Sequence, residues 1–137
     1  MTAVVVGYLP TPEGRAALAR GIAEAELRGT RLVVVNATRG DALVDERFVR
    51  GDARDALAAE LAQAPVPTEL RQPSDGRDIA QQLESVALET GADLIVIGLR
   101  RRTPVGKLIL GSAASRILLS VSVPVLAVKA GEEPGRS

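Results

Sequence analysis

The sequence predicts an α/β fold in which a parallel β-sheet lies between two layers of helices. Short, almost continuous runs of apolar residues alternate along the chain with longer segments whose apolar residues recur near helical spacing. Continuous apolar runs are typical of strands that are covered on both faces, as in a parallel sheet. Strands that alternate with helices of this length are joined by right-handed βαβ crossovers. We therefore predict a three-layer sandwich with the element order β-α-β-loop-α-β-α-β-α-β.

Five segments are predicted to be strands, and one of them differs from the others. The run 66–71 contains Thr68 and Glu69, with Pro67 near its start. Proline is tolerated at the start of a strand or on an edge strand, so we expect this strand at the edge of the sheet. The other four are rich in β-branched and aliphatic residues and are predicted over 3–8, 31–36, 93–98 and 123–128.

Four helices are expected between these strands, each ending close to a glycine or a proline. The first begins at Thr11 or Pro12 and ends at Gly29. The polar and charged segment 38–50 is expected to form a loop. The other helices are predicted to run from residue 51 or 52 to 64, from Ser74 or Asp75 to Gly91, and from Gly111 and Ser112 to a point before Pro124.

The composition excludes several classes of chemistry. The 137 residues suffice for one domain with its own apolar core, without a disulfide or a metal ion to hold it together. The chain has no cysteine and no histidine, which excludes disulfides, thiolate metal sites and Ser-His-Asp or Cys-His catalysis. Equal numbers of basic and acidic residues, 17 of each, and a single tyrosine and phenylalanine argue against a nucleic-acid partner.

Targeting and metal-binding signals are also missing from the sequence. The N-terminus lacks the basic region of a signal peptide, and every apolar run is far shorter than the roughly 20 residues that cross a membrane. We therefore expect a cytoplasmic protein without a membrane partner. The carboxylates of Asp41, Asp45 and Glu46 lie in a charged segment without the spacing of a calcium loop, so no metal site is expected.

The segment 98–112 carries the clearest binding signal. Ligands of open α/β sheets bind beyond the carboxyl ends of the strands. Here a predicted strand ends at Gly98, three consecutive arginines follow, and Gly111 and Ser112 open a helix. Free N–H groups at a helix start attract anions, and glycine lets a phosphate approach the backbone closely. The alternative is that the two glycines are only turn residues and Ser112 only an N-cap. The segment matches neither the P-loop nor the dinucleotide-binding glycine pattern.

Three stretches of the sequence, in their order and spacing, resemble the universal stress protein family. They are residues 92–98 (ADLIVIG), 108–112 (LILGS) and 123–128 (VPVLAV), and the similarity extends over residues 4–128. The resemblance implies a five-stranded parallel sheet of order 3-2-1-4-5 flanked by helices, and a homodimer. We expect this domain over residues 1–129 and a short flexible tail over 130–137. The nucleotide-binding branch of the family uses a G-2x-G-9x-G-[S/T] motif for the phosphates and ribose of ATP.

Transferred residue by residue, this motif is incomplete in the chain. Gly98 matches the first glycine, and Gly111 with Ser112 matches the final pair, but Arg101 stands at the position of the second glycine. Arg101 either contacts the phosphates through its guanidinium, or fills the phosphate site and excludes ATP, or is a solvated loop residue. Leu9 is a second departure, because members that resemble ATP binders usually carry an aspartate there, beside the nucleotide.

The resemblance also implies that adenine contacts the backbone around Ala37 and Ile97. Tyr8, at the end of the first strand, either stacks on a base or is a half-buried core residue with its hydroxyl in water. The complete set of predicted site residues is Gly98, Arg101, Gly111, Ser112, Ala37, Ile97 and Tyr8.

Two hypotheses for the function follow. The first is a homodimeric, cytoplasmic universal stress protein that binds an adenine nucleotide, ATP with or without Mg²⁺, in a stress response. The second is a signalling or structural dimer of the same family in which Arg101 and Leu9 have replaced nucleotide-site residues. Any ATP hydrolysis is expected to be slow, because the chain offers no histidine and no evident carboxylate to position water. The dimer is predicted to form along the last strand, around Val123, Val125 and Ala127, because an exposed apolar edge strand must be covered.

Overall fold

The computed structural model describes residues 2–37, 48–73, 76–99 and 111–130. The strands of this part of the chain are β1 (Ala3–Gly7), β2 (Arg31–Val35), β3 (Thr68–Arg71), β4 (Ala92–Leu99) and β5 (Val125–Lys129). Its helices are α1 (Pro12–Arg28), α2 (Gly51–Ala62), α3 (Ile79–Thr90) and α4 (Ser112–Ser120).

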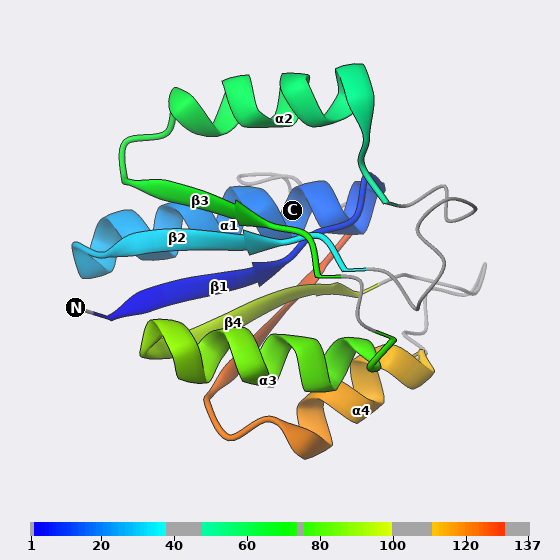
Figure 1. Cartoon of the computed structure of the whole chain (residues 1–137). Coiled ribbons are helices and arrows are strands. Elements are labelled where there is room, and N and C mark those ends of the chain that lie inside the picture. Colours follow the sequence, from blue (N-terminus) through cyan, green and yellow to red (C-terminus); the bar gives the residue numbers. More distant parts are fainter. Residues whose placement is uncertain (1, 38–47, 74–75, 100–110, 131–137) are drawn as a thin grey trace.

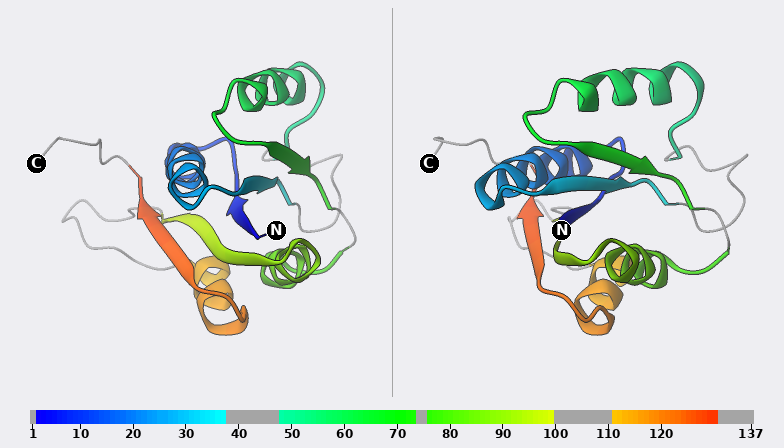
Figure 2. Two further views of the ribbon diagram at one scale, coloured as in Figure 1. Left: turned by 90° about the vertical axis from the view of Figure 1, so that its left-hand side faces the viewer. Right: turned by 60° about the vertical axis from the view of Figure 1, so that its left-hand side comes forward.

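These elements form a three-layer sandwich (Figure 1). The strands pair in parallel in the order β3-β2-β1-β4-β5, so β3 and β5 are the two edges of the sheet. Helices α1 and α2 cover one face and α3 and α4 the other (Figure 2). The predicted fold class, the strand order and the edge position of the segment around residue 68 are therefore confirmed.

Alternate residues of the central strands enter two separate apolar clusters, one on each face of the sheet. Val4 and Val6 of β1 pack with side chains of α1 and α2, whereas Ala3 and Val5 pack with side chains of α3 and α4. All four are fully buried. Because both faces of these strands are covered, polar residues have no place in them, which explains the continuous apolar runs of the sequence.

Helix α1 lies close to the sheet because its inner face carries small residues. A Cβ atom at Gly21 would overlap the side chain of Val6 in β1. The helix starts at Thr11, whose Oγ1 accepts a hydrogen bond from the N–H of Gly14 at 3.1 Å, and it ends at Gly29 in the left-handed conformation, with φ of 63°. Both ends agree with the sequence prediction. The small buried residues are Gly14, Ala17, Gly21 and Ala25.

Helix α3 begins later than the sequence predicted. The prediction placed its start at Ser74 or Asp75, whereas the helix begins at Ile79. Its N-cap is Asp78, whose Oδ1 accepts a hydrogen bond from the N–H of Gln81 at 2.9 Å, while Gln81 Oε1 accepts one from the N–H of Asp78 at 3.1 Å. This reciprocal capping box satisfies two backbone donors at once, which favours Asp78 as the start of the helix.

Two strands also begin two residues later than predicted. The prediction started them at residues 66 and 123, whereas β3 begins at Thr68 and β5 at Val125. In each case the preceding residue is a proline, which has no N–H to donate to a sheet. The carbonyl oxygens of Pro67 and Pro124 still accept hydrogen bonds, each at 2.9 Å, from the neighbouring strands β2 and β4.

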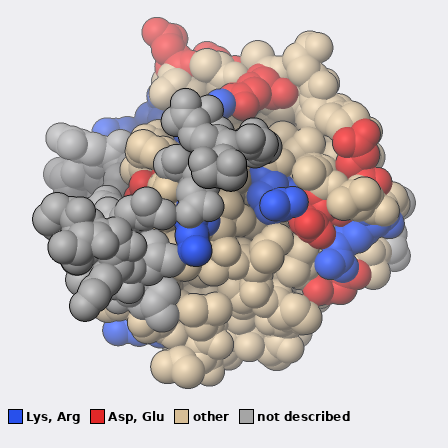
Figure 3. All heavy atoms as spheres, turned by 180° about the vertical axis from the view of Figure 1, so that it is seen from behind, with Lys and Arg blue, Asp and Glu red and all other residues tan. Residues whose placement is uncertain are grey.

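The edge strand β5 is apolar over residues 125–128 and ends in the exposed Lys129. Val125, Leu126, Ala127 and Val128 are all half-buried, and residues 117–128 include no charged side chain. Seen from behind, the lower middle of the molecule is a broad surface without charged side chains, with a basic side chain at its lower left border (Figure 3). Within the described ranges, no helix has both the length and the apolar character that crossing a membrane requires.

Candidate functional site

The candidate site lies where β1 and β4 end side by side in the middle of the sheet. The chain leaves these two strands in opposite directions, because β1 leads through α1 to β2 on one side and β4 leads through α4 to β5 on the other (Figure 1). Ligands of open α/β sheets bind at such a switch point, outside the carboxyl ends of the strands. The starts of α1 and α4 therefore border the site.

Gly98, next to last in β4, packs against the first turn of α1. A Cβ atom at this position would overlap the backbone carbonyl group of Glu13. Glycine is thus needed for the close contact between helix and strand, whether or not a ligand binds. Because β4 continues to Leu99, the interpretation of Gly98 as a turn residue is wrong.

Gly111, in contrast, lies in open surroundings at the start of α4. A Cβ atom here would meet no atom of the described residues within 4 Å. Gly111 is the N-cap, its φ of −69° suits any residue, and no side chain in the described part of the protein caps this helix start. The N–H groups of the first turn have no partners within the helix, and the exposed Ser112 adds a hydroxyl beside them. Free N–H groups at a helix start of this kind attract anions.

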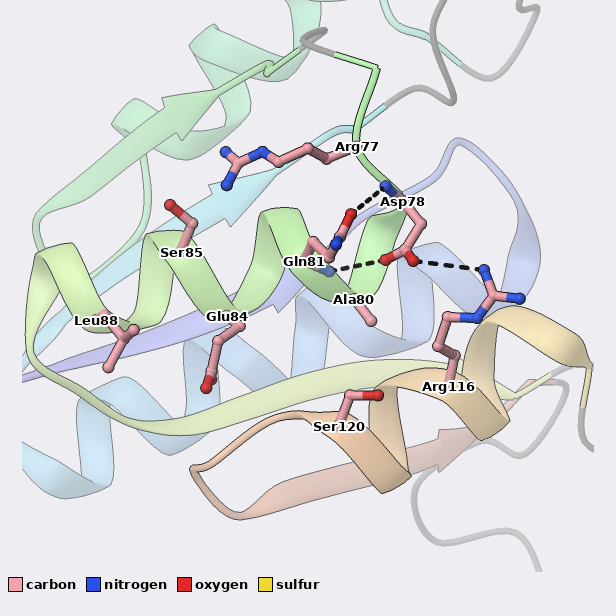
Figure 4. A pocket seen from close by; sticks show the side chains of 9 residues that line it. All are labelled: Arg77, Asp78, Ala80, Gln81, Glu84, Ser85, Leu88, Arg116 and Ser120. Atoms are coloured by element: carbon pink, nitrogen blue, oxygen red, sulfur yellow. Dashed lines mark hydrogen bonds and ion pairs between the residues drawn. The ribbon is translucent and has the colours of Figure 1, made fainter.

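A hollow connects the start of α4 with the start of α3. Asp78 and Arg116 face each other across it, with 3.5 Å between Oδ2 and Nη1 (Figure 4). A cavity of about 250 Å³ extends from this ion pair to Ser112 and Ala113. A wider groove of about 570 Å³, which shares Asp78 and Arg116, continues between α3 and α4 to Leu88. The hollow therefore brings a cation and a carboxylate to the open helix start.

The sequence analysis did not identify Arg77, Asp78 and Arg116, which line this hollow. A signal for Arg116 was present, since it follows Ser112 by four residues. Residues four apart lie on the same face of a helix, so a cation at this spacing is placed above the helix start. The signal for Asp78 was the capping-box spacing to Gln81, which marks a helix start.

Ala37 and Ile97 lie in the same apolar cluster, on the side of α3 and α4. Their exposed fractions are 7% and 4%. Gly7, at the end of β1, adjoins this cluster, since a Cβ atom there would lie 3.5 Å from Ile97 Cγ2 and from Leu83 Cδ1. The structure thus brings these two predicted site residues together, with their side chains in the core.

Tyr8 lies on the opposite face of the sheet, in the cluster that faces α1 and α2, and only 5% of it is exposed. Its hydroxyl accepts a hydrogen bond from Arg15 Nη1 at 3.3 Å, and Arg15 Nη2 donates to Glu60 Oε2 at 2.8 Å. The pKa of the Arg15 guanidinium is raised, mainly by the hydrogen bond to Tyr8 and also by the contact with Glu60. The Tyr8 ring therefore lies on the opposite face of the sheet from the side chains of Ala37 and Ile97.

A buried amide network at the carboxyl ends of β1, β2 and β3 was not foreseen. Asn36 is fully buried, and its Nδ2 donates to the carbonyl oxygen of Tyr8 at 3.1 Å. Its Oδ1 accepts from the N–H of Val49 at 2.8 Å and from Nε2 of Gln72 at 3.1 Å. Gln72 Nε2 also donates to the carbonyl oxygen of Val49 at 2.6 Å. We call these four residues the amide clamp, because they join three strand ends to the segment that leads into α2.

Several predicted features lie outside the described residues: Arg101, the carboxylates Asp41, Asp45 and Glu46, and positions 131–137 of the tail. Leu9 is described, and its carbonyl oxygen accepts a hydrogen bond from the N–H of Thr11 at 2.8 Å. In the described part of the chain, no group of three or more acidic side chains is arranged to hold a metal ion.

Comparison with known sequences finds relatives that match this chain over almost its whole length. The sequence model of the "Universal stress protein family" matches residues 1–129. A universal stress protein of Mycolicibacterium smegmatis is 51% identical over 126 residues, which cover 92% of this chain and 96% of that protein.

Solved structures of the same family share the fold. A universal stress protein from Archaeoglobus fulgidus superposes with a TM-score of 0.76 at 28% identity, over 94% of this chain and 98% of that one. A complex with dAMP from the same organism gives 0.69 at 23% identity, over 94% and 98% of the two chains. A universal stress protein in complex with cAMP gives 0.67, also at 23% identity, over 93% and 96%. The chain belongs to the universal stress protein family.

Proposed function

We propose that this protein is a cytoplasmic, homodimeric universal stress protein that binds an adenine nucleotide, with ATP and Mg²⁺ as the expected ligands. Nucleotide binding would change the state of the dimer or its contact with a partner protein during stress. The observation that carries this proposal is the open start of α4, where Gly111 leaves space beside uncapped N–H groups at the switch point of the sheet.

The phosphates are expected at Gly111 and Ser112. Backbone N–H groups at a helix start carry partial positive charge and point away from the helix, which favours a bound anion. The missing side chain of Gly111 lets a phosphate oxygen reach these groups, and the Ser112 hydroxyl supplies one more donor. Arg101 is proposed to add a guanidinium that pairs with the phosphates. Gly98 contributes indirectly, since it sets the distance between β4 and α1.

The adenine is expected at the backbone of Ala37 and Ile97, at the carboxyl ends of β2 and β4. Their side chains are in the core, which leaves backbone groups as the part that a base would contact. We assign Tyr8 to the core rather than to the nucleotide, because its ring packs on the other face of the sheet and its hydroxyl already binds Arg15. The dAMP and cAMP complexes named above support an adenine ligand in this family.

Calorimetric titration of nucleotide-free protein with ATP and Mg²⁺ tests the proposal. The expected result is saturable heat of binding that is lost when Gly111 is replaced by a negatively charged residue, aspartate. The absence of binding at millimolar ATP would contradict it.

A second candidate function, a signalling or structural dimer without nucleotide, is favoured by Leu9 and Arg101. Leu9 places an apolar side chain where an aspartate is expected beside the nucleotide. The variant Arg101→Gly separates the two candidates. If Arg101 contacts the phosphates, the change weakens ATP binding and makes it less dependent on salt, because a charged contact is lost. If ATP binds only after the change, Arg101 blocks the site and the second candidate is right.

Dimerisation along β5 is part of both candidates. Among the described strands, β5 pairs only with β4, and its free edge is continuous with the uncharged surface of residues 117–128. Sedimentation at tens of micromolar protein is expected to show a dimer, and Val125→Lys is expected to yield a monomer because a charge on an edge strand opposes pairing. Leu88→Lys, at an exposed leucine of α3 and outside β5, is the matched control and should remain dimeric.

A further inference from the structure

We infer that Asn36 is a positioning residue for base recognition, because its side-chain amide fixes the backbone at Ala37. This inference rests on the proposed function, since it concerns the adenine contact expected there. The proposed recognition needs a backbone segment held in one orientation at the end of β2. The amide clamp of Asn36, Val49, Gln72 and the Tyr8 carbonyl supplies that constraint.

Asn36 is held from several sides. Its own N–H donates to the carbonyl oxygen of Arg71 in β3 at 3.0 Å, while its side chain donates to Tyr8 at the end of β1. Its Oδ1 accepts from Val49 and Gln72 at 2.8 and 3.1 Å. A carboxamide has separate donor and acceptor ends, so reversing it would set donor against donor and oxygen against oxygen. In a fully buried position such mismatches are costly, and the clamp therefore has one stable arrangement.

The clamp also brings the two described ends of the segment around residues 38–47 together. Asn36 precedes Ala37 on one side of that segment, and Val49 follows Phe48 on the other. Gln72 Nε2 donates to the Val49 carbonyl at 2.6 Å, and Gln72 Oε1 accepts from Arg54 Nε of α2 at 2.7 Å. Asn36, the residue before Ala37, is consequently held by the ends of β1 and β3 and by the segment that leads into α2, and not by β2 alone.

A fixed peptide group can distinguish bases by the direction of its hydrogen bonds. Adenine presents an amino donor where guanine presents a carbonyl acceptor. A site that offers a backbone group in one orientation therefore accepts adenine and leaves a polar group unpaired when guanine enters. If the peptide at Ala37 becomes free to reorient, the preference for adenine falls, while the phosphate contacts at α4 remain.

The test compares ATP and GTP binding by calorimetry, with inorganic tripolyphosphate and Mg²⁺ as a probe of the phosphate site alone. The native protein is expected to bind ATP more tightly than GTP. Asn36→Asp keeps the size and the acceptor of the side chain but sets an oxygen against the Tyr8 carbonyl. We expect it to lower the ATP to GTP affinity ratio by about tenfold, the effect of roughly one lost buried hydrogen bond. Tripolyphosphate affinity should stay within about twofold of the native value.

Two further variants keep the test decisive. Gln72→Met removes the hydrogen bonds from Gln72 to Asn36 and to the Val49 carbonyl oxygen. Gln72 is half-buried, and this variant replaces Asn36→Asp if Asn36→Asp does not fold. Thr90→Val is the matched control, since it removes a buried side-chain hydrogen bond to Val86 (2.7 Å) at the end of α3, away from the clamp. Thr90→Val should lower thermal stability and leave the ATP to GTP ratio unchanged.

An unchanged ratio in both clamp variants would overturn the inference and reduce Asn36 to a structural role. The same conclusion would follow if Thr90→Val lowered the ratio as much as the clamp variants do. Failure of the proposed function itself looks different, because the native protein would then give no heat with ATP at all.

Discussion

The starts of α1 and α4 follow the carboxyl ends of the neighbouring strands β1 and β4, yet the two helix starts are built in opposite ways. The start of α1 is closed: Thr11 caps it with its side chain, Gly14 packs against the backbone of Leu9, and Gly98 packs against Glu13. The start of α4 is open, with neither a side-chain cap nor an atom of the described residues within 4 Å of a Cβ placed on Gly111. Within the part of the chain that the structure describes, side chains and backbone close the start of α1 but not that of α4, where we propose that a ligand binds.

This difference shows that two positions of one sequence motif are glycine for different physical reasons. Gly98 is glycine because a helix backbone occupies the space of its side chain. Gly111 has no such neighbour among the described residues, and its backbone is not left-handed. We propose that glycine at this position leaves space for a phosphate. The predictions below test this contrast, first through stability and then through binding.

Gly98→Ala is expected to have the largest effect. The new methyl group would overlap the Glu13 backbone, and a helix backbone cannot move aside as a flexible side chain can. We expect the free energy of unfolding to fall by about 3 kcal/mol, the upper end of the usual loss in overpacked cores. Urea denaturation measures this loss. Gly111→Ala is the matched control and should cost less than about 1 kcal/mol, the range of an altered N-cap. Equal losses at the two positions would contradict the contrast.

Gly111→Asp should move stability and binding in opposite directions. An aspartate at an N-cap accepts a hydrogen bond from the first turn and interacts favourably with the helix dipole, which stabilises a helix by about 1 kcal/mol. The same carboxylate would occupy the expected phosphate position and repel it, so ATP affinity should fall by more than about tenfold, or roughly 1.4 kcal/mol. Thermal unfolding measures the change in stability, and calorimetry measures the change in ATP affinity. A variant that is less stable and binds ATP normally would show that the open start serves no ligand.

Thr11→Ala is the corresponding change at the closed helix start. It removes the hydrogen bond from the N–H of Gly14 to Thr11 Oγ1 and should lower the free energy of unfolding by about 1 kcal/mol. Thr11→Ser retains the hydroxyl and should restore most of the loss. ATP affinity is expected to change less than in Gly111→Asp, because α1 is capped by its own chain. A larger effect on binding than on stability would mean that α1 also takes part in the site.

The sequence predicted the elements of this fold well because their causes are local. The apolar runs around Val5 and Val33 and the caps at Thr11 and Gly29 depend on residues close in the chain. The start of α3 was misplaced because Ser74, Asp75 and Asp78 are all acceptable caps by type. Only the reciprocal bond with Gln81 distinguishes Asp78.

The site was predictable only in part, since its contacts join residues far apart in the sequence. Glycine at position 98 indicated a motif, but its contact with Glu13 depends on how close α1 lies to β4. The bond from Asn36 to Tyr8 and the pair of Asp78 with Arg116 likewise need the packed structure. The spacing of Arg116 to Ser112 and of Asp78 to Gln81 is local, but no local pattern marks the contacts themselves, because asparagine at a strand end and arginine on a helix are common for other reasons.

Ser112→Ala is expected to have the smallest effect and to act on binding alone. The Ser112 side chain is exposed at the first position of α4 and is not the N-cap, so the free energy of unfolding should change by less than about 0.5 kcal/mol. If the hydroxyl donates to a phosphate, its loss removes one hydrogen bond and should weaken ATP binding by about 0.5–1.5 kcal/mol. Ser120→Ala, at the other end of the same helix and also exposed, is the control and should change neither quantity. Because the backbone N–H groups of the open start are the same in both variants, the difference between them measures the hydroxyl separately from the helix start.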